Sequence, residues 1–191
     1  MAWETELSET LKKLKAPETS HHEGFEQSAV LVPIAFNPEK QRHEILLTKR
    51  TMLVETHKGQ ISFPGGYLEP QDESHLHTAT REAHEEIGLD PKAVEILGAL
   101  SPVLTRFSVA IFPWVGRVQL PYDFALSKGE VEKIIFLPVQ ELVEKGLTDM
   151  TVEINGMKIK TPGIWAENEL VWGATAKILE ELREALLSVK F

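Results

Sequence analysis

The chain contains no cysteine among its 191 residues. A disulfide framework, a thiolate nucleophile and a zinc site with thiolate ligands are therefore excluded, and a cytoplasmic setting is expected. The sequence also lacks an apolar run as long as a membrane span, and its first residues show no signal-peptide pattern. We expect a soluble intracellular protein that has no membrane partner.

Basic residues are in the minority, because 20 Lys and Arg face 29 Asp and Glu, for a net charge of -9. Such a balance argues against a surface that coats nucleic acid. An acidic protein can still bind an anionic small molecule where metal ions neutralise the contact. With 42% hydrophobic and 26% charged residues, the composition is that of an ordinary globular protein.

The order of the periodic segments predicts an α/β fold in one domain over 1–191, with an N-terminal helix and linker in 1–27 and the core in 28–191. Strands are expected over 28–36, 44–50, 61–63, 94–100, 110–118 and 130–137, with a hairpin over 151–160 around Asn155-Gly156. Helices are expected over 4–15, over the segment that ends before Gly88, and over 139–145 and 169–189. Residues 102–107 and 121–128 are expected to be connecting loops.

Three glutamates, Glu82, Glu85 and Glu86, lie within five residues of one another. On a helix they occupy one arc of roughly 100°. Their mutual repulsion weakens an isolated helix, but it disappears when a hard divalent cation such as Mg²⁺ or Mn²⁺ is bound between them. In isolation such a cluster is more often a solvated acidic face. A separate apolar stripe can face a core and consists of Leu76, Ala79, Ala83 and Ile87.

The same segment resembles the second half of the Nudix box, G-x5-E-x7-R-E-U-x-E-E-x-G-U with U an aliphatic residue. The matching residues are Arg81-Glu82-Ala83-x-Glu85-Glu86-x-Gly88-Leu89. The first half departs from the motif, because counting back from Arg81 puts the expected glutamate at Glu73 and the expected glycine at Tyr67, whereas the actual glycines end at Gly66. One extra residue lies in this loop, so either Asp72 or Glu73 fills the first acidic position.

The resemblance implies a Nudix-type α/β/α sandwich with a mixed central sheet. It also implies metal-dependent hydrolysis of a phosphoanhydride bond in a nucleoside diphosphate derivative. The implied ligands of Mg²⁺ or Mn²⁺ are Glu82, Glu85, Glu86 and the carbonyl of Gly65. Arg81 is expected to pair with Glu73 and Glu85 and to fix their orientation. The general base is a box glutamate or a later residue, and Glu130 resembles an extra acidic ligand that some members supply.

A second element precedes the box and resembles the pattern L-L-T-x-R-S-x3-R-x3-G-x3-F-P-G-G of the Nudix subfamily that hydrolyses coenzyme A and its derivatives. Thr51 replaces the Ser of this pattern, and Glu55 stands where the pattern has Arg. The residues that agree are Leu46, Leu47, Thr48, Arg50, Gly59, Phe63, Pro64, Gly65 and Gly66. The expected substrate contacts are Arg50, Lys58, Gly65, Gly66 and Arg106.

Three functions remain open at this point. The first is hydrolysis of coenzyme A or its derivatives to adenosine 3′,5′-bisphosphate and 4′-phosphopantetheine, by a monomer or homodimer. The second is a Nudix pyrophosphatase that acts on ADP-ribose, a dinucleotide or a nucleotide sugar, which the reversed charge at Glu55 favours. The third is a non-catalytic nucleotide-binding module, which the complete set of box glutamates disfavours.

Five histidines are predicted to have no part in the chemistry. His75, His77 and His84 lie on or near the acidic helix and are expected to face solvent. His21 and His22 lie in a polar segment without a nearby partner, so they are expected in a surface loop rather than in a metal site.

Overall fold

The computed structural model describes residues 2–13, 24–54, 57–154 and 156–189. The last two residues of the predicted helix over 4–15 and the predictions for His21, His22, Glu55 and Asn155 therefore lie outside the described residues. In the described ranges, no helix is both long enough and apolar enough to cross a membrane. The helices are α1 (Ala2–Lys13), α2 (His75–Ile87), α3 (Val139–Lys145) and α4 (Gly173–Leu187), with a 3-10 turn, η2 (Pro91–Ala93).

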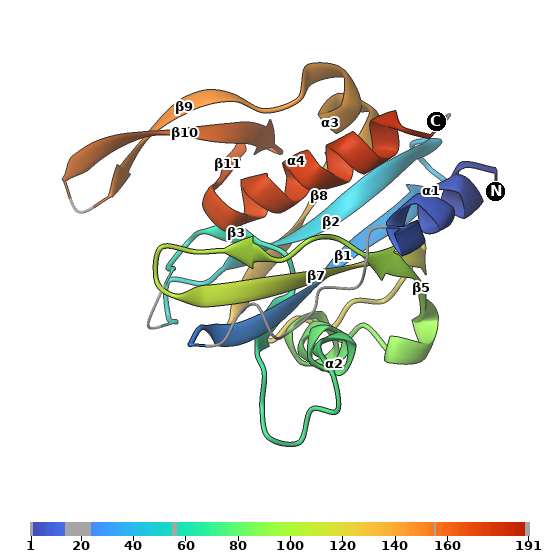
Figure 1. The fold of residues 1–191 in the computed structure, drawn as a ribbon, viewed down its shortest axis with the longest axis horizontal. Coiled ribbons are helices and arrows are strands. Elements are labelled where there is room, and N and C mark those ends of the chain that lie inside the picture. Colours follow the sequence, from blue (N-terminus) through green and yellow to red (C-terminus); the bar gives the residue numbers. More distant parts are fainter. Residues whose placement is uncertain (1, 14–23, 55–56, 155, 190–191) are drawn as a thin grey trace.

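The described strands form two sheets (Figure 1). The larger sheet is mixed and contains β1 (Glu26–Asn37), β2 (Arg42–Arg50), β3 (Ile61–Ser62), β4 (Gly65–Tyr67), β5 (Val94–Ala99), β6 (Val103–Leu104), β7 (Val109–Gln119) and β8 (Val131–Pro138). The smaller sheet is antiparallel and contains β9 (Thr148–Ile154), β10 (Met157–Ala166) and β11 (Glu169–Trp172).

Strand β1 is the centre of the larger sheet. It pairs in parallel with β7 along its whole length, from Glu26 opposite Val109 to Phe36 opposite Gln119. It also pairs antiparallel with β2 at one end and with β4 at the other. As a result, Gly65 and Gly66 pair with the central strand β1. They belong to the last strand before helix α2 in the sequence.

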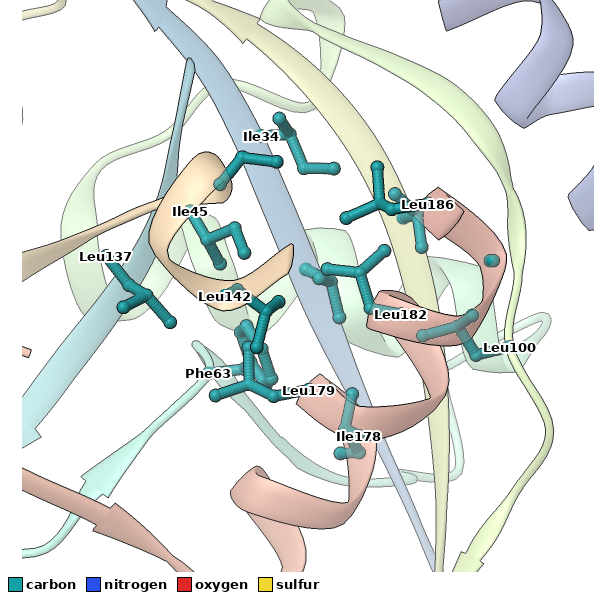
Figure 2. Close-up of a cluster of buried hydrophobic side chains, with 14 of the residues drawn as sticks. Ile34, Ile45, Phe63, Leu100, Leu137, Leu142, Ile178, Leu179, Leu182 and Leu186 are labelled. Atoms are coloured by element: carbon teal, nitrogen blue, oxygen red, sulfur yellow. The ribbon is translucent and has the colours of Figure 1, made fainter. Parts of the chain in front are cut away.

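The two faces of the larger sheet are covered by different helices, with α4 on one face and α2 on the other (Figure 1). Alternate residues of β1 point to each face, so Val30, Val32 and Ile34 contribute to the core under α1, α3 and α4. Ala29 and Leu31 contribute to the core under α2. Figure 2 shows part of the first core, which includes Phe63 and Leu179. This layering confirms the α/β/α sandwich with a mixed central sheet.

The C-terminal helix begins later than predicted. Residues Glu169–Trp172 form strand β11, and the helix starts at Gly173. Glu167 and Asn168 both have positive φ, of 48° and 65°, and make the two-residue turn that joins β10 to β11. Left-handed turns of this kind match the twist of a hairpin. The apolar spacing of the segment suits a strand as well as a helix, and pairing with β10 decides for the strand.

Short strands were also missed. Strand β6 lies in a predicted connecting loop and strand β4 was not predicted, but each pairs with a central strand of the larger sheet. The predicted hairpin is longer than its sequence signature, because β9 and β10 pair from Gly163 opposite Thr148 to Met157 opposite Ile154.

Candidate active site

Helix α2 is fixed at both ends. Ser74 caps its start, where the hydroxyl accepts a hydrogen bond from the N–H of His77 at 3.1 Å. Gly88 ends it in the left-handed conformation with φ of 69° and donates its N–H to the carbonyl of His84. Ala79 and Ala83 are fully buried in the core under the helix. Ala79, Ala83 and Ile87 of the predicted apolar stripe therefore pack in the core, whereas Leu76 is half-buried, and the glutamates lie along the rim of the stripe.

The two glycines of β4 touch this rim. A Cβ at Gly66 would lie 2.4 Å from the carboxyl carbon of Glu82, so no other residue fits without displacing that carboxylate. The N–H of Gly65 donates a hydrogen bond to Oε2 of Glu86 at 3.3 Å. The glycines thus allow two box carboxylates to lie against the backbone of β4.

The three glutamates, which the sequence places on one arc, have different environments. Glu86 is 3% exposed, Glu82 is half-buried and Glu85 is exposed. Burial raises the pKa of Glu86 to about 8, against the opposing charge of Arg50, whose Nη1 lies 3.5 Å from Oε1. Burial also raises the pKa of Glu82. Two carboxyl groups are therefore held where their charge is costly.

Arg81 is the hub of the acidic cluster. Its Nη1 lies 2.9 Å from Oε1 of Glu82 and donates to Oε2 of Glu85 at 3.1 Å. Its Nε and Nη2 donate to the two oxygens of Asp72, each at 3.0 Å, in a bidentate pair. The predicted contact with Glu85 is present. The predicted contact with Glu73 is wrong, because Glu73 is exposed and Asp72 takes its place.

Asp72 owes its position to the extra residue in the loop. Its side chain is fully buried, accepts hydrogen bonds from the hydroxyl of Thr78 at 2.9 Å and from the N–H of Glu69 at 3.0 Å, and lies under Arg81. The hydrogen bonds from Arg81 hold the pKa of Asp72 well below its ordinary range. Counting back from Arg81 along the motif puts the first acidic position at Glu73. In the structure, the turn closed by the N–H of Glu69 directs the side chain of Asp72 inward instead.

Glu130 approaches the cluster through a loop contact that sequence reasoning missed. The loop after β7 attaches to the end of α2, where the N–H of Ser127 donates to the carbonyl of Glu86 at 2.9 Å. The carbonyl of Glu130 accepts the N–H of Thr51, the residue after Arg50. The charge of Glu130 contributes to raising the pKa of both Glu82 and Glu86. Glu130 therefore lies within electrostatic range of both carboxylates.

The remaining predicted contacts lie on the loops around this cluster. Lys58 and Arg106 are exposed, and within the described part of the chain no hydrogen bond or ion pair joins either of them to the box carboxylates. His75 was predicted to face solvent, and this prediction is wrong. Its ring stacks on Phe112 with centroids 3.7 Å apart, and its Nε2 lies 2.8 Å from Oε1 of Gln27. The signal was its position four residues before Ala79, on the apolar stripe.

The donor set of the cluster fits a hard divalent cation. Acidic side chains outnumber the two arginines that contact them, and carboxylate oxygens are the ligands that Mg²⁺ and Mn²⁺ prefer. Among the described residues, no three acidic or histidine side chains converge as a ready-made metal shell, since the box glutamates face Arg81 or Arg50. A bound cation would therefore draw the carboxylates together and replace contacts with arginine.

Comparison with known proteins agrees with this geometry. Residues 26–154 match the NUDIX domain. The uncharacterized Nudix hydrolase NudL of Klebsiella pneumoniae is 34% identical over 172 residues, which cover 89% of this chain and 88% of that protein. The protein of the same name from Salmonella paratyphi B is 33% identical with the same coverage.

Solved structures share the fold. The Nudix hydrolase RenU of M. smegmatis superimposes with a TM-score of 0.58 at 14% identity, over 87% of this chain and 88% of that one. A MutT/nudix family protein from Enterococcus faecalis gives the same TM-score and identity over 86% of this chain and 63% of that one. From the extent of the domain match and the identity to whole relatives, the chain belongs to the Nudix family and is a Nudix hydrolase, an enzyme that acts on nucleoside diphosphate derivatives.

Proposed function

We propose that this chain is a divalent-metal-dependent pyrophosphatase of coenzyme A or its derivatives, which produces adenosine 3′,5′-bisphosphate and 4′-phosphopantetheine. The observation that carries the proposal is the acidic cluster of α2 placed against Gly65 and Gly66 of β4. The order in which the chain presents Arg50, the glycines and the box glutamates is that of the coenzyme A element followed by the Nudix box. A cytoplasmic setting, consistent with a chain without cysteine, belongs to the same proposal.

Glu82, Glu85, Glu86 and the carbonyl of Gly65 would hold Mg²⁺ or Mn²⁺. When bound, the cation neutralises phosphate oxygens and makes water a stronger nucleophile. Arg81 fixes the directions of Glu82 and Glu85, because its own orientation is set by the bidentate pair with Asp72. The fixed orientation of Arg81 matters because a misplaced carboxylate loses most of its effect on the transition state.

The proton of the attacking water must pass to a carboxylate that solvent and substrate can reach. Glu86 is almost completely buried and already accepts the N–H of Gly65, so it is poorly placed for this role. Glu85 and Glu130 are both exposed, and we propose that one of them is the general base. Glu85→Gln and Glu130→Gln distinguish them, since loss of the base changes the pH profile of kcat and loss of a ligand changes the metal requirement.

A substrate panel tests the proposal. Coenzyme A, 3′-dephospho-coenzyme A, ADP-ribose, dinucleotides and nucleotide sugars are offered with Mg²⁺ and with Mn²⁺, and the products are identified by mass. We expect coenzyme A to be cleaved at the pyrophosphate with the highest kcat/KM, and excess EDTA to abolish turnover without unfolding the protein. Full turnover in EDTA would refute the metal requirement.

The alternative substrate class is supported by Glu55, which reverses the charge of the subfamily's Arg. A repulsive contact with the 3′-phosphate of coenzyme A would cost about 10- to 100-fold in kcat/KM. Glu55→Arg should then raise kcat/KM for coenzyme A more than for the dephospho form. An equal response of the two would show that Glu55 does not face that phosphate, and a preference for ADP-ribose or a dinucleotide in the panel would favour the alternative.

A further inference from the structure

Arg50 reaches the acidic cluster from the opposite side to Arg81. It is the last residue of β2, and its backbone N–H donates to the carbonyl of Gln60 at 3.0 Å. The pairing of β2 with β8 is irregular between Lys49 and Arg50, a type of irregularity that occurs often next to active sites. Its guanidinium then extends to α2, where Nη1 lies 3.5 Å from Oε1 of Glu86. The strand fixes the backbone, but within the described ranges this long contact is the one ion pair that joins the end of the side chain to α2.

The contact between Arg50 and Glu86 is loose. At 3.5 Å it is longer than the roughly 2.7–2.9 Å of a charge-assisted hydrogen bond. The Nε of Arg50 is buried and has no hydrogen-bond partner within the described part of the chain. The Arg50 side chain is 26% exposed and its guanidinium is not saturated by protein acceptors, so its exposed end has the capacity to take an anionic oxygen.

The oxygen that Arg50 faces is also the one that a cation would need. Oε2 of Glu86 accepts the N–H of Gly65, which leaves Oε1 as the freer oxygen. A divalent ion and a guanidinium repel one another strongly at a separation of a few ångströms. They are therefore alternative partners of the same carboxylate.

We infer that Arg50 is an exchangeable partner of Glu86: it contacts Glu86 in the metal-free enzyme, yields Glu86 to the divalent cation, and then binds a phosphate oxygen of the substrate. The inference rests on the proposed function and adds a consequence that this function does not require. Arg50 must weaken metal binding while it strengthens substrate binding. A merely structural arginine would support both.

Arg50→Gln tests the opposite signs. Mn²⁺ alone, titrated calorimetrically into the metal-free protein at low ionic strength, should bind the variant about 10-fold more tightly than the wild type, because one positive charge has been removed. In saturating Mn²⁺, the KM for the best substrate of the panel should rise about 10-fold, because a charge-assisted contact with phosphate is lost. Arg50→Lys, which keeps the charge, should bind Mn²⁺ like the wild type.

Lys177→Gln is the matched control, since it makes the same change in net charge from an exposed position on α4. It should alter neither quantity, and circular dichroism checks that each variant is folded. Equal or weaker Mn²⁺ binding by Arg50→Gln would overturn the inference while leaving the proposed function intact if the wild type binds metal and cleaves substrate. Failure of the wild type to bind Mn²⁺ at all would overturn the proposed function and this inference together.

Discussion

The two faces of the central sheet differ in what they contribute: one mainly stabilises the fold, and the other carries the candidate active site. The face under α4 is closed by aliphatic side chains, including Leu179 and Leu182, both fully buried (Figure 2). The face under α2 has an apolar core in which alanines pack with larger side chains such as Leu31 and Phe112, but it also has a rim of carboxylates and arginines. A charged rim adds little to stability and much to chemistry, whereas an aliphatic core does the reverse. Substitutions on the two faces should therefore separate stability from turnover.

The largest effect is expected on the α4 face. Leu182→Ala should lower the free energy of unfolding by about 2–5 kcal/mol, because it leaves a cavity in a fully buried site. The kcat of the molecules that remain folded should not change. Urea denaturation and activity at a permissive temperature measure the two quantities, and Lys177→Ala on the exposed side of the same helix is the control. A large fall in kcat with stability intact would contradict the division between the faces.

The reverse pattern is expected at the rim of α2. Glu85→Gln and Glu86→Gln should each lower kcat on the order of 10² or more, because each removes a metal ligand or the base. Neither should unfold the protein, since each variant removes one of several like charges. Steady-state kinetics and thermal denaturation in EDTA provide the measurements. Wild-type rates in both variants would refute the site.

Asp72 tests the comparison between the two faces more finely. It lies beneath the rim of α2, so a substitution there should change both the free energy of unfolding and kcat. Asp72→Asn places an amide where the guanidinium of Arg81 needs an oxygen, so stability should fall by about 1–3 kcal/mol and kcat by about 10-fold. Glu73→Gln, one residue away and exposed, is the matched control and should behave as wild type. If Glu73→Gln proved the more damaging variant, the assignment of the first acidic position would be wrong.

The smallest effect is expected at Glu44, a buried carboxylate on β2. Burial alone would raise its pKa, but hydrogen bonds from Asn37, Arg42 and Lys40 outweigh burial and hold the pKa below 4.5. Its contribution to stability is therefore complete above pH 4.5 and is lost as the pH falls through the lower, folded-state pKa.

Glu44→Gln should cost about 1–2 kcal/mol at pH 7, since charge-assisted hydrogen bonds become neutral ones. The gap in melting temperature between wild type and variant should narrow in acid below pH 4.5. A gap that stays constant as the pH falls further would show that the charge of Glu44 is not stabilised by the fold.

The sequence predicts those features that depend on local periodicity. Most of the apolar stripe of α2, the end of this helix at Gly88 and the buried apolar run of β1 follow from the order of residues, and the structure confirms them. Features that depend on contacts between distant segments could not be predicted from the order of residues. Strand β11 owes its conformation to β10, and the ring of His75 owes its burial to Phe112.

The same distinction applies within the site. The glutamates could be named from their spacing, but spacing gives all three the same environment. Their different burial arises from β4, which the sequence showed only as a pair of glycines. The inward turn of Asp72 depends on a loop hydrogen bond from Glu69, and the approach of Glu130 depends on Ser127. Neither contact leaves a periodic signal.

The parallel pairing of β1 with β7 has a kinetic consequence. These strands lie on either side of α2 in the sequence. The chain between them must lose conformational entropy as it closes into a loop, before the contacts between the strands can stabilise the fold. Helix α2 can form from local interactions in microseconds, but its glutamates meet Gly66 and Arg50 only when β4 and β2 have joined β1. We therefore expect the site to assemble late in folding, and we expect cations to slow unfolding more than they speed refolding.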